Sequence, residues 1–246
     1  EYTSAQLSTT RGPTPELIIG DSGSGDLDCP SALAFDEDGD LWVAASDSDE
    51  LLGYSQTQLA SSGTPVPSVV LSDDGAGQLA SPAGLAFDAA GDLWVSNAAA
   101  GTLVAYSPDQ LTSSGAPAPA LSLADDGSGS LNSPHQIAFD TSGDLWVASS
   151  GTNQLLAYSP EALASSGSPT ASIVVSDDGS GSLDEPSGVA FDPSGDLWVT
   201  SPDSESLLEY TPGELSTTGA PSATVVTGTA TELSGPYGIA ISGAST

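Results

Sequence analysis

The sequence predicts an all-β protein, a β-propeller of four-stranded blades. The first observation is a tandem repeat with a period of 52 residues that runs through the chain. The second is that each repeat holds four short strand-like runs, separated by turns rich in Gly, Pro, Ser and Asp. A lone four-stranded sheet leaves both faces exposed, so the repeats must stack around an axis to bury them.

Aromatic residues show the repeat most clearly, because Phe, Trp and Tyr each recur at intervals of 52 residues. Since each aromatic occupies the same place in every copy, we expect the Phe and Trp side chains to pack between blades and not around a cofactor. The recurring positions are Phe35, Phe87, Phe139 and Phe191; Trp42, Trp94, Trp146 and Trp198; and Tyr2, Tyr54, Tyr106, Tyr158 and Tyr210.

The second copy illustrates the expected elements of one blade. Its strands are expected at residues 84–88, 92–96, 102–106 and 120–123. A Gly-containing turn joins the first two, and a long Ser-, Gly- and Pro-rich connection precedes the fourth. Residues 108–111 are expected to form at most one helical turn, because no segment keeps a helical period over about 12 residues.

The whole chain is expected to be one propeller domain, residues 1–246. Its repeats begin near residues 31, 83, 135 and 187, with partial blade material at 1–30 and 236–246. The Gly-Asp-Leu-Trp-Val strand occurs four times, whereas the first and the fourth strands occur five times. Four blades are therefore complete and a fifth is partial, and the intact ring is expected to have five or six.

Two explanations of the partial blade stay open. The chain could be a piece of a longer protein with at least one more repeat. Alternatively, a strand from another subunit completes the ring, because an unpaired strand edge is a template for association.

The repeat also carries a resemblance to a known family. Its Pro-x-Gly-hydrophobic-Ala-Phe-Asp, Gly-Asp-Leu-Trp-Val and Tyr-Ser-Pro elements resemble NHL-type repeats over nearly the whole chain. They are also similar to the six-bladed propellers of the virginiamycin B lyase (streptogramin lyase) group. The resemblance implies a fold more than a function, because such repeats serve many roles.

The charge of the chain narrows its partners. There is one basic residue, Arg11, against 33 Asp and Glu, which gives a formal net charge of −32. Nucleic acids and anionic membrane surfaces are therefore excluded as partners, since both require basic residues. We expect an extracellular or cell-surface location. Cys29, the single cysteine, is expected to be a small buried thiol, with pairing to a cysteine of another chain as the alternative.

Two sets of Asp-rich turns recur. The first set consists of Asp-Asp-Gly-x-Gly turns at residues 73–77, 125–129 and 177–181, with a weaker copy at 21–25. Carboxylates beside glycines would suit Ca²⁺, but we interpret them as ordinary turns, because the bidentate Glu of a calcium loop is missing. The second set precedes the Trp strand, as in residues 36–40 and 88–92, and is interpreted as hairpin chemistry with Gly at a positive φ.

The candidate ligand-binding residues are His135, Gln136 and Tyr237. His135 and Gln136 lie where a loop leads into the first strand of a blade. Loops at this place often line the mouth of the central channel. Several histidines and an acidic residue act around a metal in the lyase group, whereas His135 is the only histidine of this chain. No catalytic residue, metal ligand or required cofactor is therefore assigned.

These observations favour a non-enzymatic, extracellular surface, adhesion or self-assembling scaffold protein. Its expected partners are other copies of the chain, through strand complementation, or a surface ligand. The alternatives are a lyase or hydrolase whose site is completed outside this sequence, and a carbohydrate-binding lectin.

Overall fold

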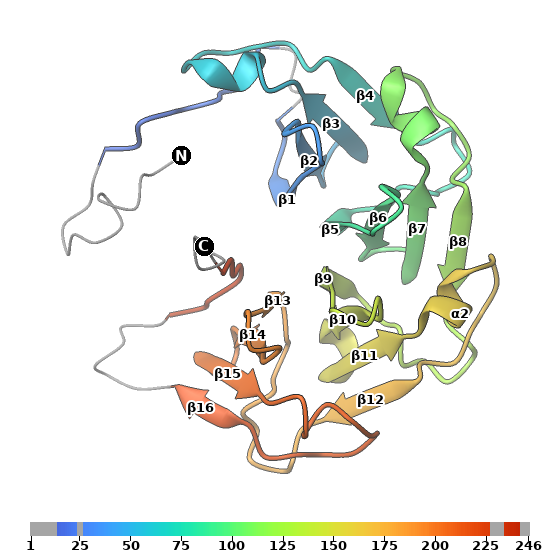
Figure 1. The fold of residues 1–246 in the computed structure, drawn as a ribbon, viewed down its shortest axis with the longest axis vertical. Coiled ribbons are helices and arrows are strands. Elements are labelled where there is room, and N and C mark those ends of the chain that lie inside the picture. The colour runs from blue at the N-terminus through green and yellow to red at the C-terminus, as the bar shows by residue number, and fades with distance from the viewer. Residues whose placement is uncertain (1–13, 24–26, 227–233, 242–246) are drawn as a thin grey trace.

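The computed structural model describes residues 14–23, 27–226 and 234–241, and confirms the all-β prediction (Figure 1). It contains four antiparallel sheets of four strands, each with its strands in sequence order. The strands are β1 (Pro30–Phe35), β2 (Leu41–Ala45), β3 (Glu50–Tyr54), β4 (Val69–Ser72), β5 (Pro82–Phe87), β6 (Leu93–Asn97), β7 (Thr102–Tyr106), β8 (Leu121–Ala124), β9 (Pro134–Phe139), β10 (Leu145–Ser149), β11 (Gln154–Tyr158), β12 (Ile173–Ser176), β13 (Val189–Phe191), β14 (Leu197–Ser201), β15 (Ser206–Tyr210) and β16 (Thr224–Val226).

Helical structure in the described residues is limited to single turns. Three are 3-10 turns, η1 (Gln58–Ala60), η2 (Pro108–Thr112) and η3 (Ser150–Thr152), and one is the α-turn α2 (Pro160–Leu163). The predicted turn at 108–111 is thus confirmed. A capping box on Ser107 and a proline at its start explain why η2 begins where it does.

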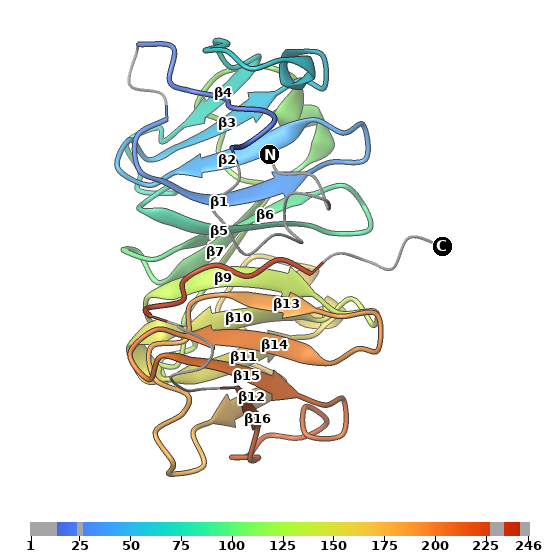
Figure 2. The ribbon, with the colours of Figure 1, turned by 90° about the vertical axis from the view of Figure 1, so that its left-hand side faces the viewer.

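The four sheets are the blades of a propeller. The first strand of each blade lies toward the centre and the fourth lies outermost (Figure 1). Seen from the side, the blades follow one another with their faces in contact (Figure 2). The described segments 14–23 and 234–241 lie at the two ends of this arc (Figure 1).

Each hairpin between the first two strands is held by one aspartate. In the second blade, Asp88 Oδ1 accepts the amide N–H groups of Ala90 at 2.8 Å and Asp92 at 3.0 Å. Its Oδ2 accepts the indole Nε1–H of Trp94 at 3.1 Å. Gly91 has φ 85°, which confirms the predicted glycine turn. The same aspartate-to-indole bond occurs at Asp36 and Trp42, Asp140 and Trp146, and Asp192 and Trp198.

Aromatic rings join neighbouring blades, as the repeat predicted. Trp94 contacts Phe139 of the next blade edge to face, with ring centroids 6.4 Å apart. Trp146 contacts Phe191 in the same way at 6.2 Å. Phe35 is 63 % exposed, because the described residues place no tryptophan of a preceding blade against it.

The outer strands β4, β8 and β12 of the first three blades are also hydrogen-bonded to the next blade. Val70 of β4 donates its N–H to Ser114 Oγ at 3.0 Å and accepts the N–H of Gly115 at 2.9 Å. We call this contact the staple. It covers the outer edge of a blade, which would otherwise present unpaired backbone groups. The staple recurs between Ile18 and Ser62–Gly63, Ser122 and Ser166–Gly167, and Val174 and Thr218–Gly219.

The fifth copy of the first strand, at residues 238–241, is only partly realised. No sheet includes it, yet the carbonyl of Tyr237 accepts the Thr200 hydroxyl at 2.9 Å. The carbonyl of His135 accepts the hydroxyl of Ser96 in the same arrangement two blades earlier. This segment therefore packs against the fourth blade as an inner strand would. The expected strand material at Glu1–Tyr2 and beyond residue 241 lies outside the described residues.

The prediction of a buried Cys29 is wrong, because its side chain is exposed. It lies in the loop before β1 with φ 48°, immediately before Pro30. Ser81 and Ser133 occupy the same place before their prolines with φ 49° and 47°. The position is thus a left-handed turn before a proline, and it is exposed at Cys29 and half-buried at Ser81 and Ser133.

Candidate functional site at the mouth of the central channel

A cavity of about 400 Å³ lies where the first strands begin, at the centre of the ring. Because first strands line the centre, their entry loops meet there (Figure 1). Polar and small side chains form its wall. They are Ser31, Ser46, Ser81, Ala83, Ala98, His135, Gln136, Ser187 and Tyr237, together with Pro30 and Gly238.

All three candidate residues from the sequence line this one cavity. His135 and Gln136 are half-buried on β9, and their backbone is fixed because the Gln136 N–H donates to the Ser187 carbonyl at 3.0 Å. Tyr237 lies in the fifth first-strand copy and is 66 % exposed. The structure therefore brings together residues that are 102 positions apart in the sequence.

The serines of the cavity wall were missed, although the repeat contains the signal that finds them. Pro30, Pro82, Pro134, Pro186 and Pro236 begin the successive copies. The residues that follow them are Ser31, Ala83, His135, Ser187 and Tyr237, and all five line the cavity. The residue that follows the recurring proline therefore lies at the channel mouth in every copy.

Hydrogen bonds between blades hold the entry loops in a strained backbone conformation. Ser81 donates its N–H to Asp49 Oδ1 of the preceding blade at 2.7 Å, and Glu185 donates to Asn153 Oδ1 at 3.0 Å. Both Ser81 and Glu185 have φ near 50° directly before a proline, where left-handed geometry is costly. The cavity wall is thus held rigid by the fold.

His135 is the titratable side chain of this cavity that can exchange a proton near neutral pH. Burial lowers its pKa from the ordinary value of 6.5, and the charge of Glu185 opposes this shift. The imidazole is therefore neutral at pH 7 and offers one donor and one acceptor. With serine hydroxyls around it, the cavity suits a small polar ligand.

The Asp-Asp-Gly loops use their first carboxylate to bind their own backbone. Asp125 Oδ2 accepts the N–H groups of Gly127 and Gly129, both at 2.8 Å, and its Oδ1 accepts that of Leu131 at 3.0 Å. The bond from Leu131 is the main reason why the pKa of Asp125 is lowered. Within the described ranges, no three His, Cys, Asp or Glu side chains are grouped as metal ligands. Calcium binding at these loops stays the untested alternative to their interpretation as ordinary turns.

Replacing Ser222 by alanine is expected to raise the pKa of Asp178. Hydrogen bonds from Ser180 and Ser222 lower that pKa to about 2, and the Ser222 hydroxyl donates to Asp178 Oδ2 at 2.6 Å. A depressed carboxyl pKa adds stability above the ordinary value of 3.8, and this stability is lost as the pH falls toward 2. NMR titration of the carboxyl measures the shift. Asp126, the matching residue one blade earlier, should titrate as before, and an unchanged Asp178 would contradict the prediction.

Comparisons with known proteins support the fold. No family model and no curated protein sequence matches the chain. A catalytically inactive virginiamycin B lyase from Staphylococcus aureus with quinupristin aligns with a TM-score of 0.60 and 13 % identity, over 85 % of this chain and 58 % of the lyase. A selenomethionine-substituted form gives 0.59 and 15 %, over 87 % and 60 %. The extracellular domain of a hybrid two component system from B. thetaiotaomicron gives 0.55 and 16 %, over 82 % and 24 %.

The chain is therefore a β-propeller, similar in fold to the virginiamycin B lyase group. It spans less than two thirds of the length of these lyase structures. At such identities the likeness concerns the fold alone. In the described residues, no helix is long and apolar enough to cross a membrane.

Proposed function

We propose that this protein is a non-enzymatic, extracellular scaffold that self-assembles through strand edges at the cell surface. One observation carries the proposal. The N–H and C=O of Val225 on β16 face away from β15, at the place where β4, β8 and β12 each bind a staple. Among the described residues no segment covers this edge, and Val225 is 43 % exposed.

The staple defines what the free edge can accept. The partner segment has a Ser or Thr whose hydroxyl oxygen accepts the strand N–H, followed by Gly whose N–H donates to the strand carbonyl. Such a segment can come from another propeller as well as from the next blade, since strand addition requires only backbone groups and one hydroxyl. Because Ile18 occupies the Ser62–Gly63 segment of its own propeller, a second copy adds head to tail by displacing Ile18, and repeated addition would form a filament.

The charge of the chain and one structural neighbour support this proposal. A surface with a net charge of −32 repels other copies in dilute salt, so assembly belongs in a medium rich in cations. One of the structures with a similar fold is an extracellular domain. An exposed Cys29 and blades without a disulfide fit any compartment, so they do not decide the location.

Replacing Val225 by proline is expected to abolish assembly, because proline lacks the outward N–H that a staple hydroxyl accepts. The N–H of residue 225 has no role in pairing with β15, so the fold should survive. Light scattering after gel filtration, and electron microscopy at increasing concentration and salt, measure the assembled mass.

Val225→Thr is the matched control, because it keeps the backbone N–H and the branched side chain. It should assemble like the parent protein. The proposal fails if the parent protein stays monomeric over the full range of concentration and salt, or if Val225→Pro assembles as readily as Val225→Thr.

A further inference from the structure

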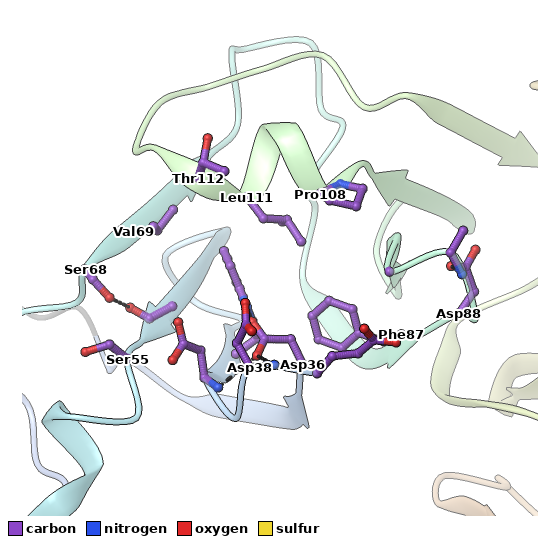
Figure 3. A pocket seen from close by; sticks show the side chains of 16 residues that line it. Asp36, Asp38, Ser55, Ser68, Val69, Phe87, Asp88, Pro108, Leu111 and Thr112 are labelled. Atoms are coloured by element: carbon purple, nitrogen blue, oxygen red, sulfur yellow. Dashed lines mark hydrogen bonds between the residues drawn. The ribbon is translucent and has the colours of Figure 1, made fainter.

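Three similar grooves lie between successive blades, at the end of the propeller opposite the channel mouth. They form beside the hairpins that join the first two strands of each blade, and their volumes are about 580, 520 and 470 Å³ in chain order. The first groove is drawn in Figure 3. Because first strands run from the mouth to these hairpins, the grooves and the channel cavity occupy opposite faces.

Each groove has an apolar interior built by two blades. In the first groove, Trp42 and Phe87 belong to the walls. Leu111 of η2 points into the groove, on the side of Phe87 (Figure 3). Trp94, Phe139 and Leu163 repeat this set in the second groove, and Trp146, Phe191 and Leu215 in the third. A groove with an apolar interior accommodates the hydrocarbon stem of a long side chain.

Carboxylates surround each apolar interior. The hairpin aspartates of two blades meet at every groove: Asp88, Asp92 and Asp140 line the second, and Asp140, Asp144 and Asp192 line the third. Burial, and then the charge of Asp88, raise the pKa of Asp92. The described residues supply no basic side chain there; the one basic residue of the chain, Arg11, lies outside them.

The first groove departs from the repeat in two ways, one that adds negative charge and one that leaves more space. Glu37 and Asp38 add two exposed carboxylates that the other hairpins lack. Gly53 stands where Ala105 and Ala157 stand in the next two blades, and a Cβ there would lie 3.2 Å from the Trp42 ring. The first groove thus has the most carboxylates and the largest volume of the three.

We propose that these grooves form a multivalent docking surface for a basic polypeptide, whose Lys or Arg side chains enter successive grooves. The stem of each side chain packs on the partly exposed Phe ring of a groove, and its charged end reaches the aspartates at the rim. Grooves that repeat from blade to blade let one extended partner engage several sites at once, which multiplies weak individual contacts. Charge complementarity identifies the partner as cationic, and the apolar interior requires a side chain with a hydrocarbon stem.

Fluorescence anisotropy with a labelled oligolysine peptide on the full chain tests this proposal. The variant Glu37→Gln/Asp38→Asn is expected to bind about fivefold to tenfold more weakly, because two rim charges are lost. Both side chains are exposed, so the fold should be unaffected. The matched control, Asp203→Asn/Glu205→Gln, removes equal charge from exposed sites at the turn between β14 and β15 and should bind like the parent protein.

Further measurements separate docking in grooves from general attraction to an acidic surface. The variant Gly53→Ala narrows the first groove without changing charge, and we expect it to weaken binding by about twofold to threefold. A peptide with acetylated lysines should not bind, and salt should weaken the unmodified peptide. The proposal is overturned if both charge-removing variants lose affinity equally, or if Ca²⁺ or spermine displaces the peptide at equal cation concentration, since that would indicate a site for small cations.

Discussion

Replacing Gly84 by alanine is expected to destabilise the propeller by about 3 kcal/mol. A Cβ on Gly84 would lie 2.5 Å from the carbonyl oxygen of His135 and 2.8 Å from the Cα of Gln136. Both belong to the backbone of the next blade, so no side-chain rotation relieves the contact, and the two blades must separate. Chemical denaturation followed by tryptophan fluorescence measures the loss.

Gly115→Ala is the matched control for this experiment. Nothing lies within 4 Å of a Cβ built at Gly115, so its change in unfolding free energy should stay below about 0.5 kcal/mol. Gly188 repeats the Gly84 geometry, with the Tyr237 carbonyl oxygen 2.7 Å from the added Cβ, and should behave as Gly84 does. Equal effects at positions 84 and 115 would show that close approach between blades does not matter.

The 52-residue repeat predicts most of this fold because equivalent residues of each copy pack in the same way in every blade. Strand positions follow from alternating apolar residues, and the pairing of Trp94 with Phe139 follows from their places on facing sheets. The close approach at Gly84 is different in kind. In the first and third copies, the position of Gly84 is occupied by Ala32 and Gln136. The repeat alone therefore gives no reason to expect that alanine at position 84 would clash with the next blade.

The channel mouth could be predicted in part for a related reason. His135 and Tyr237 differ from their counterparts in other copies, and that difference singled them out. Ser31 and Ser187 line the same cavity. Serine is common in every repeat, so nothing in the sequence distinguished these two residues before the ring placed them around one cavity. Exposure of Cys29 was beyond sequence reasoning as well, because it depends on a left-handed turn before a proline, which backbone propensity disfavours.

The hairpin aspartates were interpreted correctly as turn residues, but their second role could not be seen in the sequence. Each also accepts the indole N–H of a tryptophan six residues later, as Asp140 does for Trp146 at 3.2 Å. That bond requires the hairpin to bring both side chains to one face, which is a consequence of folding. The same aspartates line the inter-blade grooves, so one residue type serves the turn, the core and the proposed docking surface.

Replacing Asp140 by alanine is expected to cost about 3 kcal/mol of stability. The substitution leaves the Nε1–H of Trp146 without its acceptor, and that side chain is only 2 % exposed. An unsatisfied buried donor costs about 1–3 kcal/mol. The amide N–H groups of Ser142 and Asp144 also lose their acceptor, as in the loss of a helix cap worth about 1 kcal/mol. Thermal and chemical denaturation measure the change.

Asparagine at position 140 distinguishes the hydrogen bonds from the size of the side chain. Its single amide oxygen can serve the turn or the indole but not both, so we expect about half the loss seen with alanine.

The pKa of Asp144 should fall in either variant. Burial is the largest cause of the raised pKa of Asp144, and the negative charge of Asp140 adds to it. Without that charge, burial and the charge of Glu161 remain as the causes that raise the pKa. Asp203→Ala, at an exposed site, should change stability by less than about 0.5 kcal/mol, and a comparable loss there would mean that overall charge and not the indole bond stabilises the blade.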